Sequence, residues 1–272
     1  MPDRIISLKH VSAGYGRSRA GKPDERSLVI KDMSLEITQG SSVCLLGPNG
    51  SGKTTLLRVI AGMLSAHGEV LVDGKNIREM RRKEIASYIS FLSQISRAYY
   101  SFSVFETVMH GRYVHGSSFF SGTASKDREV VEETLENLGL KDLSDRQITT
   151  LSGGQLQRVM LARCIAQESP VMILDEPMNH LDMRIQSELI EYLFRWRERP
   201  VGRDQGEVYQ PTIIAVFHDI SITACIAEEI ALVSEGRLLA FGRKENVLTE
   251  ELLEKTYRFD VVGFLKKYRS FF

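Results

Sequence analysis

The chain has 272 residues, 43% hydrophobic and 26% charged, which is the composition of an ordinary globular protein with room for a full core. Its 35 basic residues balance its 35 acidic ones, so no overall positive charge supports a nucleic-acid partner. No stretch approaches the roughly 18 apolar residues of a membrane span, and no apolar signal-peptide segment follows the first residues. We therefore expect a protein that does not cross a bilayer by itself. Its three cysteines, Cys44, Cys164 and Cys225, are far apart and are expected to be reduced and buried.

The first third of the chain contains several short strand candidates. Residues 5–11, 28–37, 70–72 and 89–92 alternate between apolar and polar positions, and an Asp73-Gly74 turn follows the third of them. This pattern predicts an antiparallel sheet.

A glycine-rich segment lies between the second and third of these candidates. Residues 47–54, Gly-Pro-Asn-Gly-Ser-Gly-Lys-Thr, follow the apolar run 42–46 and open a predicted helix over 54–60. The spacing is that of a P-loop, whose backbone N–H groups surround phosphates while the lysine reaches the β and γ oxygens and the hydroxyl binds Mg²⁺. The sequence therefore predicts that the chain binds and hydrolyses ATP. The predicted ATP-binding residues here are Gly47, Pro48, Asn49, Gly50, Ser51, Gly52, Lys53, Thr54 and Thr55.

The character of the chain becomes helical between residues 95 and 150. Val131, Leu135 and Leu138 form one apolar face of a segment that begins after Ser125. We expect an inserted helical subdomain there, and surface loops at 16–26 and 198–210. The tail from 255 mixes aromatic and basic residues, and it fits either a packing helix or a contact with a membrane protein or lipid headgroups.

Two further apolar runs, 171–174 and 213–217, have the continuous hydrophobic character of parallel strands buried on both faces. The first ends at Asp175 and Glu176, and the second ends at His218. Since ligands gather at the carboxyl ends of such strands, these side chains are expected near the nucleotide. The position of the pair predicts that Asp175 holds Mg²⁺ and that Glu176 lies near the attacking water.

One more motif fits no general phosphate loop, namely Leu151, Ser152, Gly153, Gly154 and Gln155. Together with the P-loop before it and Asp175-Glu176-Pro177 after it, this motif resembles the signature of the nucleotide-binding subunit of an ATP-binding cassette (ABC) transporter. The resemblance covers nearly the whole chain. It implies an α/β fold: a P-loop NTPase (RecA-like) core, an antiparallel β subdomain and an inserted helical subdomain. The implied single ABC ATPase domain, 1–272, divides into a core at 1–94 and 151–250, a helical subdomain at 95–150 and a tail at 251–272.

The resemblance also implies roles for individual residues. Tyr15 would stack on adenine, Gln94 would sense Mg²⁺ and the attacking water, and His218 would hydrogen-bond the γ-phosphate. Glu176 would act as the general base, and Asp182 would communicate across a dimer. The metal ligands would be Thr54, Gln94 and Asp175.

In the family the signature of one subunit closes over the P-loop ATP of another. The motif of residues 151–155, present once, therefore implies a dimer of this chain with two composite ATP sites. Ser152 would bind the γ-phosphate at the start of a helix, and it would cap that helix at the same time. Met178 and Leu156 depart from the usual family pattern without removing a phosphate or Mg²⁺ ligand.

Transport by such a subunit requires a membrane permease. The aromatic stretch 98–108 lies where the family receives the permease's coupling helix, although its aromatics also suit a helical core. Residues 107–113 with His115, 179–182 and 247–249 resemble ATPases of iron-siderophore, haem and cobalamin importers. This likeness implies two permease subunits, a substrate-binding protein and a place on the cytoplasmic face of the inner membrane.

Three alternatives remain open at this stage. A zinc, manganese or molybdate importer would differ only in the substrate that is taken up. A non-transport cassette acting on ribosomes, DNA ends or iron-sulfur assembly would generally carry two cassettes or long coiled-coil insertions, and this chain has neither. A small-molecule kinase would leave the signature motif unexplained.

Overall fold

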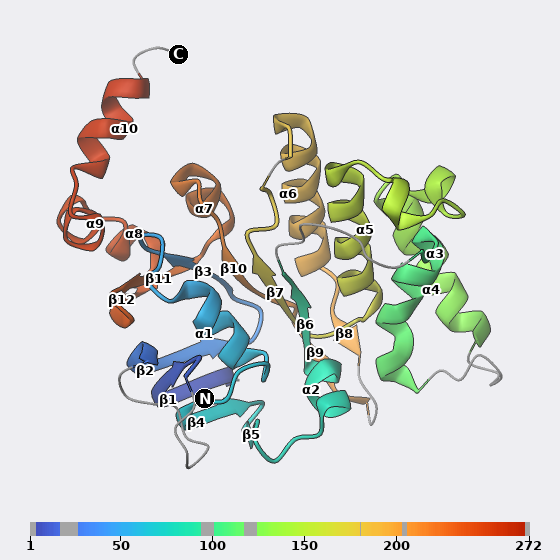
Figure 1. The fold of residues 1–272 in the computed structure, drawn as a ribbon, viewed down its shortest axis with the longest axis horizontal. Coiled ribbons are helices and arrows are strands. Elements are labelled where there is room, and N and C mark those ends of the chain that lie inside the picture. Colours follow the sequence, from blue (N-terminus) through green and yellow to red (C-terminus); the bar gives the residue numbers. More distant parts are fainter. Residues whose placement is uncertain are drawn as a thin grey trace. The chain divides into compact units, whose positions relative to one another are not determined.

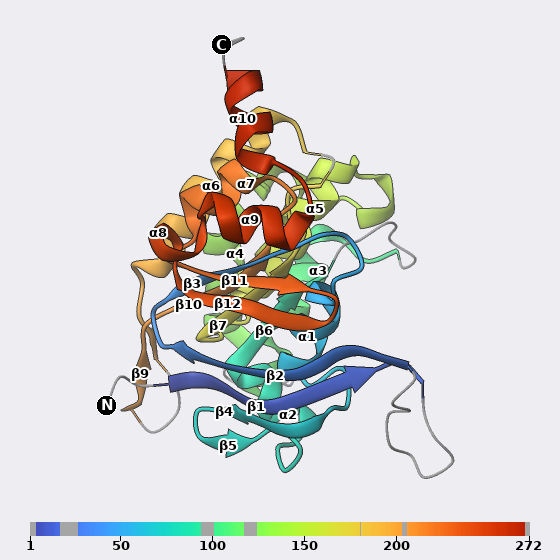
Figure 2. The ribbon, with the colours of Figure 1, turned by 90° about the vertical axis from the view of Figure 1, so that its left-hand side faces the viewer.

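An antiparallel sheet forms from strands in the first third of the chain, in the order β2-β1-β4-β5. Figure 2 shows β1, β2 and β4 side by side. In β2 the buried residues alternate with exposed ones, which is why this strand suits a sheet with one solvated face. The strands are Arg4–Gly14 (β1), Leu28–Thr38 (β2), His67–Val72 (β4) and Lys75–Asn76 (β5).

The computed structural model describes residues 4–16, 27–93, 101–116, 124–179, 181–202 and 206–269. The chain divides into two compact units, each described here by itself: unit 1 comprises residues 1–80 and 213–272, and unit 2 comprises 81–212. The subdomain boundaries expected from the sequence stay a prediction.

Unit 1 also contains strands in the order β12-β11-β3-β10 (Figure 1). Strand β3 pairs in parallel with both β10 and β11, and every residue of β3 and β10 is buried, as the continuous apolar runs predict. The strands are Ser42–Leu46 (β3), Thr212–Val216 (β10), Glu229–Ser234 (β11) and Arg237–Arg243 (β12). The helices of this unit are Lys53–Ile60 (α1), Ile220–Ile226 (α7), Lys244–Val247 (α8), Glu250–Tyr257 (α9) and Val261–Arg269 (α10).

Unit 2 contains the predicted helical segment. Helices α3, α4 and α5 pack against one another (Figure 1), and Val131 and Leu135 of α4 are buried as their spacing predicts. The helices are Arg82–Tyr88 (α2), Val104–Met109 (α3), Ala124–Asn137 (α4), Gly153–Ala166 (α5) and Met183–Arg197 (α6), with short 3₁₀ turns at His110–His115 (η2), Lys141–Leu143 (η3) and Ile148–Thr150 (η4). The strands are Ile89–Leu92 (β6), Val171–Asp175 (β7), Val201–Gly202 (β8) and Val208–Tyr209 (β9).

Three expectations from the sequence are wrong. Strand β6 does not join the antiparallel sheet but pairs in parallel with β7, because its nearly continuous burial suits a covered sheet. The region 198–210 contains the antiparallel pair β8–β9, which buries Val201 and Tyr209. Cys225 is exposed, whereas Cys44 and Cys164 are buried, and burial raises the pKa of the Cys164 thiol to about 11.

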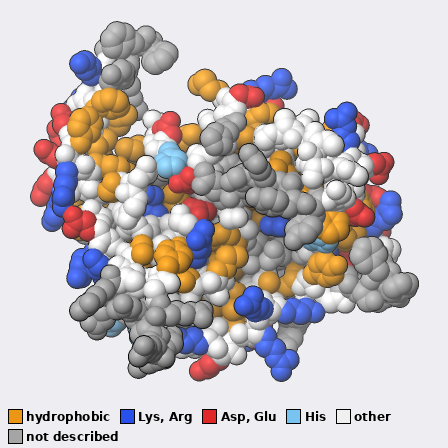
Figure 3. All heavy atoms as spheres, viewed as in Figure 1, with side chains coloured by type: hydrophobic (Ala, Val, Ile, Leu, Met, Phe, Trp, Pro, Cys, Tyr) orange, Lys and Arg blue, Asp and Glu red, His pale blue; other side chains and the backbone are white. Residues whose placement is uncertain are grey.

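The C-terminal segment forms the helices α9 and α10. Rings of Phe259 and Phe264 meet edge to face with 5.7 Å between their centroids, and both side chains are about half exposed. Figure 3 shows hydrophobic side chains on the surface where Figure 1 places α10. This helix therefore does not bury all of its aromatic residues within unit 1.

Candidate nucleotide-binding site

The P-loop of unit 1 connects the buried strand β3 to helix α1, which is the strand-loop-helix setting that the motif requires. Gly47 begins the loop with a φ of +154°, and a Cβ atom there would lie 1.9 Å from the carbonyl oxygen of Val233 in β11. Only glycine fits this position. The loop is therefore held tightly against the neighbouring strand.

Lys53 is the first residue of α1, and its side chain turns back over the loop. Its Nζ donates hydrogen bonds to the carbonyl oxygens of Gly47 and Pro48 at 2.7 and 2.9 Å. The side chain is buried, and the first turn of α1 contains no acidic residue. The loop thus combines a positive charge with a helix N-terminus, and both attract an anion.

Tyr15 stands beside this helix. Its hydroxyl lies 3.3 Å from Thr55 Oγ1 and accepts a hydrogen bond from Arg58 at 3.0 Å. The side chain is 56% exposed, so its ring has a free face although its hydroxyl is anchored. The structure therefore brings Tyr15 together with the P-loop helix, while its stacking on adenine stays a prediction.

A contact that the sequence does not signal connects the C-terminal helices to the P-loop. Burial raises the pKa of Tyr257 in α9, and a hydrogen bond from the backbone of Gly47 partly offsets this rise. The two residues are far apart in the sequence and carry no shared motif, so only the fold reveals their proximity.

His218 lies in unit 1, two residues after the last residue of the buried strand β10, and is exposed. The next residue, Asp219, caps helix α7 by accepting a hydrogen bond from the backbone N–H of Ser221 at 2.6 Å. A strand on one side and a helix cap on the other thus fix the backbone of His218.

In unit 2, strand β7 carries the two predicted carboxylates. Asp175 is the last residue of the strand and is buried, whereas Glu176 leaves the strand in the left-handed region with φ of +56°. The Glu176 carboxylate accepts a hydrogen bond from Asn179, with 2.6 Å between Nδ2 and Oε2. The two adjacent carboxylates therefore stand in different environments, one in the strand and one held by the following turn.

The signature motif is a helix start. Ser152 caps α5 and forms a capping box with Gln155: its hydroxyl accepts from the Gln155 N–H at 3.3 Å, and the Gln155 side chain accepts from the Ser152 N–H at 3.0 Å. Asp182 plays the same capping part for α6. Ser152 and Asp182 are both exposed, so both helix starts are accessible.

Two sets of predicted residues are thus ordered within their own units: the P-loop, Tyr15 and His218 in unit 1, and the signature, the carboxylates and Asp182 in unit 2. Gln94 and His180 lie outside the described residues. Within the described part of the chain, no three His, Cys, Asp or Glu side chains gather into a ready-made metal site. Among the helices that the structure describes, none is both long and apolar enough to cross a membrane.

A family model described as ABC transporter matches residues 30–179, more than half of the chain. The chain therefore belongs to the ABC transporter family, as an ATP-hydrolysing subunit.

Individual relatives agree with this assignment. The chain is 35% identical over 260 residues to the ferric enterobactin transport ATP-binding protein FepC of Escherichia coli (strain K12), covering 94% of this chain and 89% of the relative. It is 34% identical over 265 residues to the manganese transport system ATP-binding protein MntB of Halalkalibacterium halodurans, covering 97% and 96%. A solved structure of a proposed metal-chelate type ABC transporter in an inward-facing conformation is similar with a TM-score of 0.73 and 25% identity, over 95% of this chain and 90% of that one.

Proposed function

We propose that this chain energises an importer of a chelated metal, with an iron chelate such as a ferric siderophore, haem or a cobalamin as the substrate class. The observation that carries the catalytic part is the Glu176 carboxylate, held by Asn179 at the end of a buried strand. The similarity to a ferric enterobactin relative and to a proposed metal-chelate transporter supports the substrate class.

The nucleotide is ATP, bound as its magnesium complex. Lys53 and the amides at the start of α1 contact the β- and γ-phosphates, and Tyr15 stacks on the adenine with its exposed ring. Thr54 and Asp175, with Gln94, supply oxygen ligands, which are the donors that Mg²⁺ prefers. When bound, Mg²⁺ neutralises charge on the phosphates, and Asp175 suits this role because its buried carboxylate ends a strand.

Hydrolysis needs a base beside the attacking water. Glu176 accepts a proton from that water while the oxygen bonds to the γ-phosphorus and the bond to ADP breaks. Asn179 holds the carboxylate in place, and His218 donates a hydrogen bond to the γ-phosphate. The products are ADP and phosphate.

The working unit is a dimer of this chain. The exposed start of α5, with Ser152 and the two glycines after it, binds the γ-phosphate of the ATP held by the second copy. Asp182, which caps the start of α6, communicates across this dimer. ATP thus joins the two copies, and its hydrolysis separates them.

A permease docks on an aromatic cluster of unit 2, formed by Phe102, His110 and Tyr113. His110 stacks on Tyr113 with 5.5 Å between the ring centroids and meets Phe102 edge to face at 4.8 Å. Phe102 is 39% exposed and Tyr113 is 59% exposed. Neighbouring exposed aromatic rings are typical of a surface that binds another protein. Docking there places the protein at the cytoplasmic face of the membrane, and a substrate-binding protein delivers the substrate from the other side.

The catalytic part is tested with Glu176→Gln. We expect ATP hydrolysis to fall by about 10² to 10⁴ while ATP binding and ATP-dependent dimerisation persist. Glu132→Gln, an exposed glutamate of α4, is the matched control and should hydrolyse ATP normally. Normal turnover by Glu176→Gln would overturn the assignment of the base.

The transport part is tested by trapping Glu176→Gln with ATP and Mg²⁺ in its host and identifying the proteins that copurify from gently solubilised membranes. We expect a permease with many spanning segments, and we expect Tyr113→Ala to lose it. Recovery with ribosomal, DNA-bound or assembly proteins instead would contradict a role in transport.

A manganese importer is the second candidate, because the relative at 34% identity is a manganese transport protein. Uptake of a radioactive ferric siderophore and of radioactive manganese, compared between cells with and without the gene, separates the two. Loss of manganese uptake alone would favour the second candidate.

A further inference from the structure

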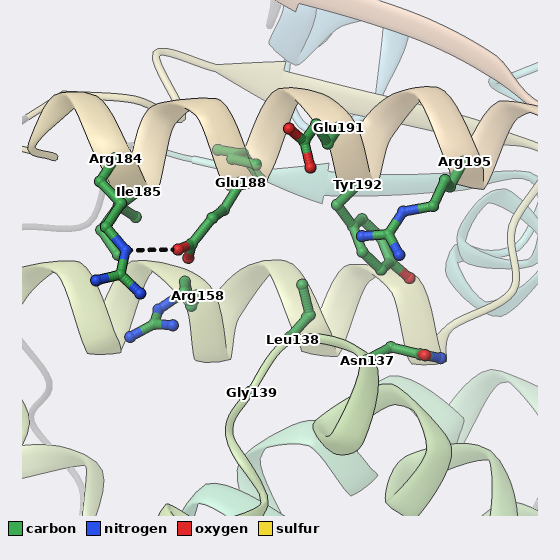
Figure 4. Close-up of a pocket in the computed structure, with 11 residues that line it drawn as sticks. Asn137, Leu138, Gly139, Arg158, Arg184, Ile185, Glu188, Glu191, Tyr192 and Arg195 are labelled. Carbon is green, nitrogen blue, oxygen red and sulfur yellow. Dashed lines mark hydrogen bonds and ion pairs between the residues drawn. The ribbon is translucent and has the colours of Figure 1, made fainter.

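Unit 2 contains a cavity of about 330 Å³, and its lining residues include neither the two carboxylates nor the signature glycines. It is open to solvent on one side and is lined by α5, α6 and the residues that end α4 (Figure 4). A volume of this size suits a small molecule rather than a single water.

Arg158 of α5 lines this cavity and is the residue that indicates a ligand there. Its Nε is buried and has no hydrogen-bond partner among the residues that the structure describes. In Figure 4 the Arg158 side chain lies along α5, at the end of the cavity where Arg184 and Glu188 of α6 lie. Since a guanidinium has only donors and stays charged, a buried N–H without an acceptor is unfavourable, and an anion in the cavity would remove that penalty.

A second cation stands further along the same cavity. Arg195 of α6 lies over the ring of Tyr192, 5.9 Å from its centroid, and Figure 4 places it at the other end from Arg158. Arg184 is engaged by Glu188 at 3.0 Å, so these two charges cancel. The other charged residues that line the cavity are Arg158, Arg195 and the exposed Glu191. The lining therefore has a net charge of +1.

The Arg195 end of the cavity adds a neutral donor, with an apolar wall beside it. Burial raises the pKa of Tyr192 to about 12, and its protonated hydroxyl, which Figure 4 places at the Arg195 end, can donate to an anionic oxygen. Leu138 and Leu189 line the cavity beside it. Two separated cations, with a hydroxyl beside one of them and apolar side chains in the lining, match a ligand with two negative charges held apart.

We propose that the cavity between α5 and α6 binds a small dicarboxylate through Arg158 and Arg195. Arg158 receives one carboxylate and Arg195 the other, with the Tyr192 hydroxyl at the Arg195 end. None of the residues proposed to bind ATP lines this cavity, and the proposal does not depend on which substrate the transporter carries.

The test is calorimetric titration of the purified full chain with inorganic phosphate and, separately, with succinate. The titrations are made in the Lys53→Ala background, which removes the P-loop as a competing phosphate site. We expect saturable binding of one ligand per chain, weakened about tenfold or more by Arg158→Gln, because a charge-assisted hydrogen bond is lost. Arg128→Gln, an exposed arginine of α4 outside the cavity, should bind as the parent does.

The two ligands distinguish a site that spans both arginines from one that holds a single anion. Saturable binding of succinate that is tighter than that of phosphate supports the proposal, whereas phosphate binding as tight as succinate binding would overturn it. Equal affinity in Arg158→Gln and its parent, or no saturable binding of either ligand, would overturn the proposal. Because Arg158 is partly buried, Arg195→Gln on the exposed side serves as a second variant, and it should also weaken binding.

Discussion

The side-chain amide of Asn179 holds the carboxylate of Glu176, with 2.6 Å between its Nδ2 and Oε2. Glu176 follows the last residue of β7, and its backbone lies in the left-handed region with φ of +56°. Asn179 constrains its side chain from within the same turn. It is therefore a positioning residue for the proposed base.

Replacing Asn179 by alanine should lower kcat about tenfold or more and leave the Kd for ATP unchanged, because the base loses orientation while the phosphate ligands stay. Steady-state ATPase kinetics and nucleotide titration measure the two quantities. Asn246→Ala, an exposed asparagine of α8, is the control. If the affinity for ATP falls in proportion to kcat, the residue has another role.

The P-loop offers a matched pair of glycine variants. Gly47→Ala should cost about 3 kcal/mol or more of unfolding free energy, because its Cβ would lie 1.9 Å from Val233 O. Gly50 also has positive φ, +78°, but a Cβ there meets nothing within 4 Å, so Gly50→Ala should cost only about 1 kcal/mol. Urea denaturation gives both values, and equal losses would show that the contact with β11 is unimportant.

Arg112 is a buried clamp of unit 2. Its Nε donates to Asp127 at 2.9 Å, and its Nη1 donates to the Ala166 carbonyl and to Glu168, both at 2.6 Å. Arg112→Ala should cost about 3 to 5 kcal/mol, because Asp127 stays buried without its partner cation. Arg199→Ala breaks an exposed pair and should cost at most about 1 kcal/mol. Similar losses for both variants in denaturant unfolding would contradict the clamp.

His110 gives a prediction about pH. Burial lowers its pKa from the ordinary value of 6.5, and the nearby Arg163 lowers it further, while Glu106 opposes the shift. The unfolded chain thus binds the proton more readily, so this contribution to stability is present above pH 6.5 and is lost as pH falls through the folded pKa. His110→Phe keeps the ring contacts and should flatten the fall in Tm between about pH 7 and about pH 5. An unchanged slope in thermal melts would contradict it.

Local features of this molecule could be predicted from the sequence, whereas contacts between distant residues could not. The P-loop, the buried strands and the capping box of Ser152 each depend on a few consecutive residues. They can therefore be predicted without knowing which distant segments are in contact. The parallel pairing of β6 was missed because the residues of a short strand do not specify the direction of its neighbour. The Tyr257 contact with Gly47, the Arg112 clamp and the arginines of the α5–α6 cavity each join segments that share no pattern.

At Glu176, whose backbone is left-handed, the residue that gives the most stable fold differs from the residue that the proposed hydrolysis of ATP needs. A residue with a Cβ costs about 1 kcal/mol or more at such a φ, and glycine does not. A laboratory selection for heat resistance alone would therefore favour glycine at 176, and the enriched variants would be sturdier proteins that have lost their proposed base. Screens for stabilised forms of this ATPase need hydrolysis as a second criterion.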